Sequence, residues 1–320
     1  MRIAILGATS RIAQDFVPRL AADGEHDLSL FARRPGAVAA WLAGVPSAQR
    51  SAVSDLASFG TQEFDAVVNF IGVGDPARAT AMGNAIFDLT LQYDGMVLDY
   101  LRDHPRCRYL FMSSGAAYGA TFDEPAERNT RAVVSINDLP PQEWYGAAKL
   151  HAECRHRAHP EWRIVDVRIF NYFSRAQDLS ARFMITDILR AVRDRAVLAI
   201  PSDNIMRDYL HPNDFHQLLR ALLASPPANA AVDCYSGAPI DKHCLLTEMQ
   251  GRFGLRYEYV DDPAAASATG IKPSYYSLNR RAADFGYQPA LTSLEGIVRE
   301  ATAILAPGSE HRRPPGGEPR

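Results

Sequence analysis

Short apolar runs alternate with longer amphipathic segments through the first half of the chain, and this alternation predicts the fold. Runs with the apolar character of buried strands occupy residues 2–6, 27–32, 65–72, 108–114 and 162–170. Segments with the helical spacing of apolar positions occupy residues 11–23, 37–44, 85–104 and 144–159, with Pro18 an awkward member of the first. Apolar strands that alternate with helices indicate an α/β fold, a doubly wound parallel sheet with helices on both faces.

The regular alternation of strand and helix patterns ends at about residue 172. Helical patterns follow at residues 181–194, 214–225 and 242–254, and strand patterns at 196–200, 230–237 and 256–260. We expect a first domain over residues 1–172, to which about 205–235 return, and a smaller interleaved lobe over 173–305. The last segment, 306–320, is rich in proline and glycine and is predicted to be disordered.

Composition narrows the class of protein. The 320 residues are 47% hydrophobic with a formal net charge of -3, which gives no electrostatic case for a nucleic-acid partner. Cys107, Cys154, Cys234 and Cys244 are far apart and form no CxxC pair, which favours reduced thiols and no metal site. No stretch approaches the roughly 20 apolar residues of a membrane span, and the amino-terminal apolar run is too short for a signal peptide. We therefore expect a soluble cytoplasmic protein.

A phosphate-binding loop that lacks two of its three usual glycines follows the first strand. A dinucleotide loop in this place normally has three glycines, for a tight turn, close approach to pyrophosphate, and packing of helix on strand. Only Gly7 is present, and Ser10 and Ala13 stand where the other two would fall. The helix that begins here still offers amide donors to an anion. Its position in the first turn makes a Rossmann-type cofactor site credible, with Gly7, Thr9, Ser10, Arg11 and Ile12 as its members.

The end of the second strand indicates which dinucleotide fits. An acid there would accept the ribose 2′-hydroxyl of NAD, whereas arginine favours the 2′-phosphate of NADP. The chain has Arg33 and Arg34 and no acid in that place, so NADP(H) is preferred, with NAD(H) as the alternative. Asp55 and Leu56, after the third strand, are candidate contacts for the adenine amino group.

Tyr145 and Lys149 lie four residues apart on a predicted helix and so share one face of it. Ser113 and Ser114 end a predicted strand upstream of them. In this order, and together with Gly7, these residues resemble the extended short-chain dehydrogenases/reductases that act on sugar nucleotides. The segments VRIFNYFS, MRDYLHPNDF and LNRRAADFGYQP resemble three further motifs of the same family, so the resemblance covers roughly residues 1–300.

The resemblance implies a Ser–Tyr–Lys catalytic set. Tyr145 would be the general acid/base, and Lys149 would favour its ionised form and hold the nicotinamide ribose. Ser114 would hydrogen-bond the reacting oxygen, with Ser113 the weaker candidate. Ile71 and Gly72 fall where the fourth strand of the family lines the cofactor.

The resemblance also implies a nucleotide-sugar substrate. Arg207 would contact its diphosphate, since a guanidinium offers forked donors to phosphate, and the alternative for Arg207 is a salt bridge between lobes. Asn171 would reach the diphosphate or the sugar. Arg280 is a further candidate clamp, as are Lys272 and Arg281.

Two residues of MRDYLHPNDF have structural rather than substrate roles in this interpretation. His211 and Asp214 precede a predicted helix, and we expect the carboxylate of Asp214 to cap its amino terminus. The family also implies a homodimer formed through the two long helices.

The residues that follow Ser114 disfavour two of the reactions known in the family. The 4,6-dehydratases of the family have an Asp-Glu pair after the active-site residue, and the 3,5-epimerases a cysteine two residues after it. Gly115 and Ala116 occupy those places. An NADP(H)-dependent reductase of a 4-keto sugar nucleotide is the leading hypothesis. An NAD-dependent 4-epimerase is the alternative, and a catalytically inactive dinucleotide-binding scaffold or sensor is a second one.

Overall fold

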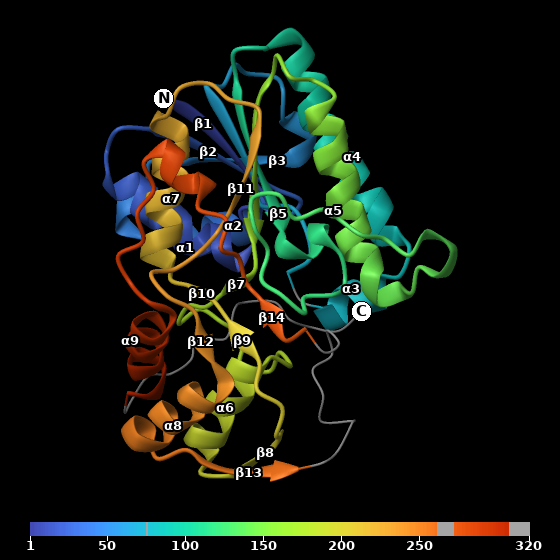
Figure 1. Ribbon diagram of the computed structural model, residues 1–320. Helices are drawn as coiled ribbons and strands as arrows, with labels where there is room; N and C mark the ends of the chain where they lie inside the picture. Colours follow the sequence, from blue (N-terminus) through green and yellow to red (C-terminus); the bar gives the residue numbers. More distant parts are fainter. Residues whose placement is uncertain (75, 261–271, 307–320) are drawn as a thin grey trace.

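The computed structural model describes residues 1–74, 76–260 and 272–306, and its centre is one seven-stranded parallel sheet (Figure 1). In spatial order its strands are β11 (Ala230–Asp233), β6 (Arg163–Ile169), β5 (Arg108–Ser114), β4 (Ala66–Asn69), β1 (Arg2–Leu6), β2 (Asp27–Ala32) and β3 (Ala52–Asp55). The strand order reverses between β1 and β4, as in doubly wound sheets. The α/β fold expected from the alternating pattern is confirmed.

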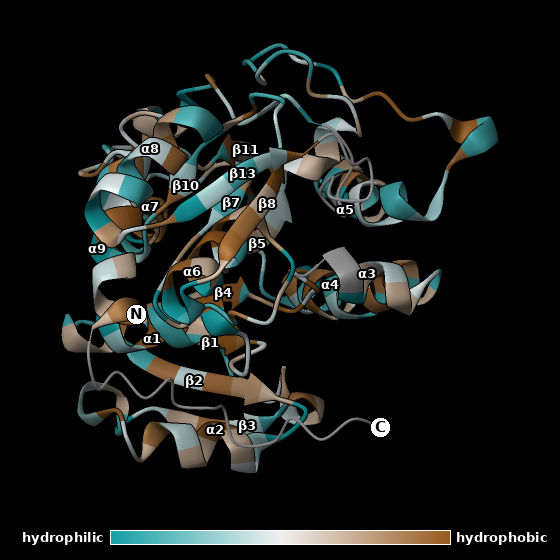
Figure 2. Cartoon of the chain, turned by 90° about the horizontal axis from the view of Figure 1, so that it is seen from below, coloured by the Kyte–Doolittle hydropathy of each residue, from teal (hydrophilic) through white to brown (hydrophobic). Residues whose placement is uncertain are grey.

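Each strand sends successive side chains to opposite faces of the sheet, so both faces are apolar. In β1, Ile3 and Ile5 pack in one hydrophobic cluster, whereas Ala4 and Leu6 pack in the other. The first cluster is covered by α1 (Arg11–Ala22), α2 (Pro35–Leu42) and α7 (Pro212–Ala224). The second is covered by α4 (Ala85–Asp103) and α5 (Pro141–Arg157). Figure 2 shows the apolar strands β4 and β5 enclosed between these layers.

A third hydrophobic cluster lies in a smaller lobe beyond the sheet, at the bottom of Figure 1. Its helices are α6 (Met184–Asp194), α8 (Lys242–Phe253) and α9 (Ser293–Leu305), and β8 (Val197–Pro201) pairs with β13 (Arg256–Val260) in a two-stranded sheet. Two small sheets lie between the lobe and the main sheet. They join β7 (Asn171–Tyr172) to β10 (Tyr209–Leu210), and β12 (Ile240–Asp241) to β9 (Met206–Arg207) and β14 (Ser274–Tyr275).

Short connecting helices complete the described chain. They are η1 (Pro46–Ala48), η2 (Leu56–Ser58), α3 (Pro76–Met82), η3 (Gly115–Tyr118), η4 (Ile136–Asp138) and η6 (Arg281–Phe285). The apolar pattern did not predict them, because segments this short lack a readable period. Residues 307–320 of the segment predicted to be disordered lie outside the described residues.

Two boundaries differ from the expectation because side chains intervene. The strand expected over 65–72 ends at Asn69, whose Oδ1 accepts a hydrogen bond from the Ile71 amide at 2.9 Å and turns the chain. The helix expected to be capped by Asp214 begins earlier, at Pro212, and the imidazole of His211 is its cap. Asp214 instead accepts from the amides of Ala290 and Leu291, at 3.0 and 3.2 Å. The expected role of Asp214 as the cap is therefore wrong.

Candidate active site

The candidate site lies at the carboxyl ends of the parallel strands. Gly7 follows β1, Gly72 follows β4, and Ser114 ends β5. The strand order reverses between the first two of these strands, and open α/β sheets hold their ligands at that edge. Residues far apart in the chain are thereby brought to one place.

Helix α5 brings Tyr145 and Lys149 to this edge. The helix begins at Pro141, whose missing amide costs nothing in the first turn, and Glu143 favours the positive end of the helix dipole. Gly146 allows α5 to approach η3 closely, since a Cβ there would lie 2.5 Å from the Ala116 carbonyl oxygen. The side chain of Tyr145, which precedes Gly146 in the sequence, can therefore reach the end of β5.

The two serines at the end of β5 face opposite ways. Ser113 donates its hydroxyl to Glu153 Oε1 at 2.6 Å, in a buried network. The Ser114 hydroxyl oxygen accepts from the Ala116 amide at 3.2 Å, and Ser114 acts to lower the pKa of the Tyr145 phenol. Because successive strand residues point to opposite faces, only Ser114 can join the tyrosine.

Lys149 is buried beneath the tyrosine. Its Nζ donates to the Met112 carbonyl oxygen at 2.7 Å and lies 5.9 Å from the centre of the Tyr145 ring. A Cβ on Gly72 would lie 3.5 Å from the same nitrogen, so the end of β4 borders it as well. Ser114, Tyr145, Lys149 and Gly72 are thus brought together.

Burial sets the protonation of the pair. It raises the pKa of Tyr145, and the neighbouring Ser114 hydroxyl lowers that pKa only in part. Burial also lowers the pKa of Lys149 to about 8, although Asp94 and Glu153 act to raise it. The phenol is therefore protonated near neutral pH and is available as a proton donor.

A second phenol, which the sequence motifs did not indicate, lies beside the same serine. The hydroxyl oxygen of Tyr275, on β14, is 3.4 Å from Ser114 Oγ. Its ring packs against Phe122 and Phe170, with centroids 4.8 and 5.2 Å away. Nothing in the sequence spacing pointed to this residue, because 161 positions separate it from Ser114.

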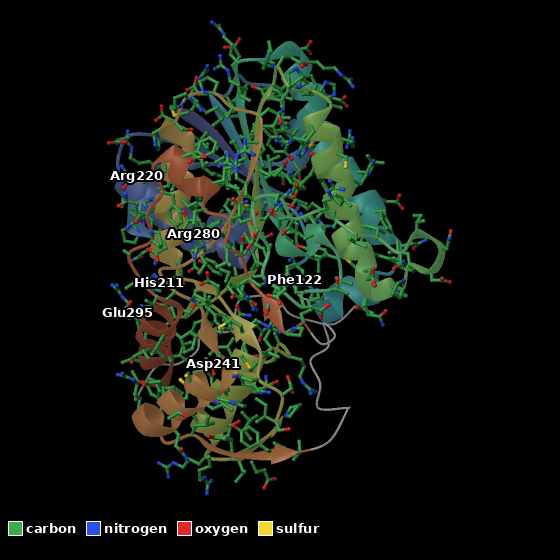
Figure 3. The ribbon with its side chains drawn as sticks, viewed as in Figure 1. Phe122, His211, Arg220, Asp241, Arg280 and Glu295 are labelled. Carbon is green, nitrogen blue, oxygen red and sulfur yellow. The ribbon has the colours of Figure 1, made fainter. Side chains whose placement is uncertain are left out.

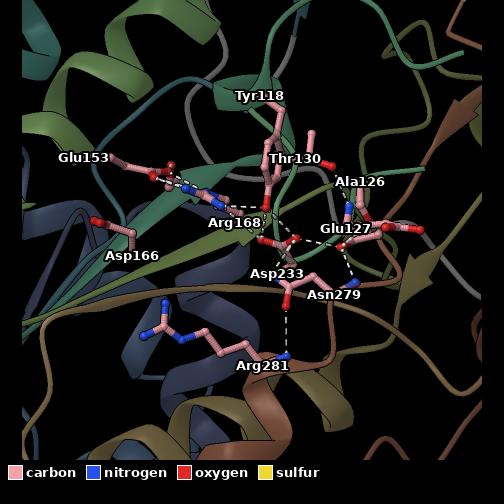
Figure 4. Close-up of polar contacts among 12 residues, drawn as sticks. Tyr118, Ala126, Glu127, Thr130, Glu153, Asp166, Arg168, Asp233, Asn279 and Arg281 are labelled. Carbon is pink, nitrogen blue, oxygen red and sulfur yellow. Dashed lines mark hydrogen bonds and ion pairs between the residues drawn. The ribbon is translucent and has the colours of Figure 1, made fainter. Parts of the chain in front are cut away.

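A buried polar network lies behind Ser114 and α5 in the candidate site (Figure 4). Arg168 on β6 donates to both carboxylate oxygens of Glu153 and to the Tyr118 hydroxyl at 2.7 Å. Tyr118 in turn donates to Asp233 at 2.9 Å, and Ser277 donates to the same carboxylate at 2.6 Å. The network joins α5, β6, η3, β11 and the segment after β14, and so it fixes the elements that carry the site.

A second buried cluster joins α4, α5 and β6. The His156 imidazole lies between Asp94 and Asp166, at 2.7 and 2.6 Å. Burial disfavours its charged form, but the two carboxylates outweigh burial and raise the pKa of His156 to about 9. Asp94 also accepts from Tyr109, to which Asn69 donates at 2.9 Å. Because Asn69 holds the turn after β4, the cluster supports the wall next to Lys149.

The phosphate loop keeps the geometry that a dinucleotide needs at one position. Gly7 has φ of 75°, and a Cβ there would lie 2.9 Å from the Ile71 amide nitrogen. Ser10 caps α1, with its hydroxyl accepting from the Ala13 amide at 3.3 Å. The amino terminus of α1 therefore opens at the strand edge and fits a pyrophosphate, although the Ser10 hydroxyl is already engaged.

The remaining residues of the loop differ in their surroundings. Thr9 is exposed, and Ile12 packs against the first hydrophobic cluster, the one that α1, α2 and α7 cover. Arg11 forms a salt bridge of 2.8 Å with Asp178, which follows β7, and this contact lowers the pKa of Asp178 to about 2. The guanidinium of Arg11 thus links the loop to the chain beyond β7.

Two arginines stand exposed at the end of β2. Within residues 1–74, 76–260 and 272–306, Arg33 and Arg34 form no salt bridge, so both can receive an anion. Asp55 caps η2 by accepting from the Ala57 amide at 2.8 Å. Leu56 is buried in the cluster between the sheet and α4. The side chains of Asp55 and Leu56 are therefore already engaged in local structure.

Arg207 lies buried between the lobe and the main sheet. Its guanidinium donates to the carbonyl oxygens of Met206 and Lys272, at 2.8 and 2.7 Å. No carboxylate in the described part of the chain forms a salt bridge with it, so the interpretation as a salt bridge between lobes is wrong. The ammonium of Lys272 lies 4.8 Å from the centre of the Tyr275 ring. Two cations thus lie near Tyr275, and neither forms a salt bridge with a carboxylate of the described residues.

The other two substrate candidates have different settings. Asn171 donates to the carbonyl oxygens of Asp208 and Tyr275, at 3.3 and 3.4 Å, so it holds the strands around Arg207. Arg280 is exposed, stacks on Tyr235 and donates to the Ser277 carbonyl oxygen. Figure 3 shows Arg280 apart from Phe122, the ring that packs on Tyr275. The structure therefore brings Asn171, but not Arg280, to the site.

In the described ranges of the chain, no helix has the length and apolar character to cross a membrane. Cys107 and Cys234 are buried, Cys154 and Cys244 are exposed, and all four are free thiols.

Known proteins resemble this chain in sequence. The model of the NAD dependent epimerase/dehydratase family matches residues 3–235. The UDP-glucose 4-epimerases 2 and 4 of Oryza sativa subsp. japonica are each 32% identical over 123 residues, which is 35% of this chain and 27% and 30% of theirs. The chain thus matches less than a third of the length of these curated relatives.

Solved structures share the fold over nearly the whole chain. A UDP-glucose-4-epimerase from Stenotrophomonas maltophila with bound NAD and formylated UDP-arabinopyranose has a TM-score of 0.78 at 15% identity, covering 95% of this chain and 98% of that one. A UDP-glucose 4-epimerase from Bifidobacterium longum in complex with NAD+ and UDP has a TM-score of 0.74 at 18% identity, covering 94% and 97%. The sequence match and the sheet order agree: the chain belongs to the NAD dependent epimerase/dehydratase family.

Proposed function

We propose that this protein is an NADP(H)-dependent reductase of a nucleotide-activated 4-keto sugar. The observation that carries the proposal is the convergence of Ser114, Tyr145 and Lys149 at the carboxyl edge of the sheet. When bound, the reduced nicotinamide supplies the hydride. Tyr145 gives its phenolic proton to the carbonyl oxygen as that oxygen gains negative charge. Ser114 hydrogen-bonds the same oxygen, and the charge of Lys149 stabilises the phenolate that is left.

The surroundings of Ser114 support reduction rather than dehydration. A side chain on Gly115 would run into the ring of Phe170, so this position has no room for the acid that a dehydratase places there. Ala116 stands where the 3,5-epimerases have a cysteine, and its carbonyl is pressed against Gly146. Proton transfer by Tyr145 is the chemistry that remains.

The end of β2 supports NADP(H). Arg33 and Arg34 are exposed and carry no salt bridge in the described residues, and a 2′-phosphate would supply the missing charge. We expect Arg33→Asp to weaken NADPH binding about tenfold or more, since a charge-assisted contact is worth roughly 1.5–3 kcal/mol, and to leave NADH binding unchanged. Fluorescence titration with both cofactors measures this, with the exposed Arg50→Asp as the matched control. An unchanged preference would remove Arg33 from the cofactor site.

Arg207 and Lys272 support a substrate with an anionic diphosphate. A buried guanidinium that lacks a carboxylate carries a desolvation cost, which an anionic ligand offsets. The sugar would then lie between this anion site and Ser114, beside Tyr275.

We extend the proposal to a cytoplasmic homodimer. Leu91 on α4 is 45% exposed, and α5 exposes Cys154 on its surface, so the two long helices offer a partly apolar surface for a second copy. Free thiols suit a reducing compartment.

A UDP-sugar 4-epimerase with retained NAD is the second candidate. It is favoured by the two rice relatives, which are UDP-glucose 4-epimerases. Both candidates use Tyr145 in the same way, but an epimerase holds its nicotinamide through two hydride transfers. Replacement of two loop glycines by Ser10 and Ala13 supports the weaker, exchangeable cofactor of a reductase.

The experiment that tests the proposal begins with a thermal-shift screen of GDP, UDP, CDP and dTDP. The 4-keto sugar of the nucleotide that binds is then offered with NADPH, and loss of the reduced-nicotinamide absorbance is followed. Substrate-dependent oxidation of NADPH supports the reductase. Inversion at C4 of a UDP-sugar without added reductant would establish the epimerase instead, and absence of both activities would favour a scaffold.

A further inference from the structure

Ser114 has a hydrogen-bonding capacity that its neighbours nearly fill. A serine hydroxyl has one proton to donate and two lone pairs to accept. One lone pair of Ser114 accepts from the Ala116 amide at 3.2 Å, and the Tyr275 hydroxyl oxygen lies 3.4 Å away. Ser114 also acts to lower the pKa of the Tyr145 phenol. The use of the single proton therefore depends on which phenol donates and which accepts.

The direction of the contact with Tyr275 follows from the same accounting. In the described part of the chain, Ser114 is the one side-chain hydrogen-bond partner of the Tyr275 hydroxyl, so donation to Ser114 satisfies the phenolic proton. Burial raises the pKa of this phenol, although Ser114 and Arg207 lower it in part, so the proton is present near neutral pH. Ser114 is the acceptor that lies within reach, at 3.4 Å.

We propose that Tyr275 is a positioning residue for Ser114: its phenol donates to the Ser114 oxygen and thereby directs the serine proton toward Tyr145 and the reacting oxygen of the substrate. With Ala116 and Tyr275 both donating, the two lone pairs of Ser114 are filled. The only remaining direction for the serine proton is the catalytic one. This inference rests on the proposed function for the identity of the reacting oxygen, but the hydrogen-bond arrangement is independent of it.

The placement of Tyr275 suits a fixed role. Its ring is held between Phe122 and Phe170, and Lys272 lies over its face at 4.8 Å. On the backbone, Tyr275 is paired with Arg207 across β14 and β9. A diphosphate that orders Arg207 would therefore order the same strand pair. A separation of 3.4 Å is long for a hydroxyl pair, and catalytic hydrogen bonds of this length shorten when substrate binds.

The kinetic test uses Tyr275→Phe, which keeps the ring and its packing and removes only the hydroxyl. With the 4-keto sugar nucleotide and NADPH, we expect kcat to fall about tenfold, the factor that corresponds to roughly one hydrogen bond, while KM stays within about twofold. Tyr276→Phe is the matched control on the same segment, with an unchanged kcat expected. A larger effect on KM than on kcat would overturn the proposal, because it would make Tyr275 a substrate contact.

A double-mutant cycle tests whether the hydroxyl acts through Ser114. In the Ser114→Ala background, Tyr275→Phe should cost less than about twofold in kcat, because the group that it positions is already gone. A full tenfold loss in both backgrounds would show that Tyr275 acts on the substrate directly and would overturn the positioning role.

A structural readout separates this inference from the proposed function. If the wild type turns over none of the offered 4-keto sugars with NADPH, the proposed function fails. Crystals grown with NADP⁺ and UDP then decide the inference alone. We expect a Tyr275–Ser114 oxygen separation below about 3.2 Å in the wild type, and a different Ser114 rotamer in Tyr275→Phe. Tyr275 turned away from Ser114 in the wild type, or an unchanged Ser114 rotamer in the variant, would contradict it.

Discussion

The candidate site has two cationic ends, and they differ in how their charges are balanced. At the acid/base end, burial lowers the pKa of Lys149 to about 8, but three buried carboxylates act against this and favour the charged ammonium. These carboxylates, Asp94, Glu153 and Asp166, belong to the two polar networks behind the sheet. This end carries its own counter-charge.

At the other end the cations have no carboxylate in salt-bridge contact, although Asp203 acts to raise the pKa of Arg207. Burial lowers the pKa of Arg207, and it also lowers that of Lys272, which the neighbouring Arg207 lowers further. Only Glu143 acts to raise the Lys272 pKa. In the described chain neither cation forms a salt bridge with a carboxylate. Cations without a salt-bridge partner are stabilised when an anion binds, which is the role that the proposed diphosphate would have at this end.

The difference separates chemistry from binding. The self-balanced end should set rates and the unbalanced end should set affinities, so substitutions at each should affect one quantity and spare the other.

The largest effect is expected for Tyr145→Phe. Removal of the phenolic oxygen deletes the proton donor but leaves the anion end intact, so kcat should fall by about 10²–10⁴-fold while the affinity for UDP stays unchanged. Steady-state kinetics and calorimetry with UDP measure the two quantities. A near-wild-type kcat would remove Tyr145 from the chemistry.

The second effect concerns the balance behind Lys149. The pKa of His156 is about 9 in the folded protein and near 6.5 in the unfolded chain, so its stabilisation is complete below pH ~6.5 and is lost as pH rises through about 9. On the order of 3 kcal/mol is involved. The melting temperature of the wild type should therefore fall between pH ~6.5 and ~9.5.

His156→Gln should be less stable at pH ~6.5 and should lack most of this pH dependence. The exposed His151→Gln on the same helix is the control, with the wild-type profile expected. The same pH dependence in His156→Gln and in the wild type would place the titrating group elsewhere.

A smaller effect is expected at the anion end. Arg207→Ala should weaken UDP binding by about 10–150-fold, the equivalent of roughly 1.5–3 kcal/mol, and leave NADPH binding unchanged. Arg252→Ala, an exposed arginine of α8, controls for loss of surface charge. Equal UDP affinity in Arg207→Ala and the wild type would reduce Arg207 to a structural residue and would end the comparison between the two ends.

Local patterns predicted the acid/base end and missed much of its setting. The helical period placed Tyr145 and Lys149 on one face, and the apolar run before Ser114 placed that serine at the end of a strand. Both signals lie within a few residues of sequence. Glu153 and Asp233, which lie in the network behind the site, have no such signal, because their partners come from other elements.

Contacts between distant segments could not be predicted in the same way. Tyr275 reaches Ser114 only because β14 pairs with β9 between the lobe and the sheet, and no periodicity reports that pairing. The cap at α7 was misassigned for a related reason. A carboxylate near a helix start suits a cap, but Asp214 is held by Ala290 and Leu291, 76 and 77 positions away in the chain.

The fate of the hydride tests the central claim most directly. The protein, purified without added cofactor, is incubated with NADPH that carries two deuterium atoms at C4 of the nicotinamide and with the 4-keto sugar of the nucleotide that binds. The account predicts one deuterium at C4 of the product sugar and a stoichiometric release of NADP⁺. Tightly bound NAD in the purified protein, no transfer of deuterium from NADPH to the keto sugar, and inversion at C4 of a UDP-sugar offered without reductant would contradict the reductase and establish the epimerase.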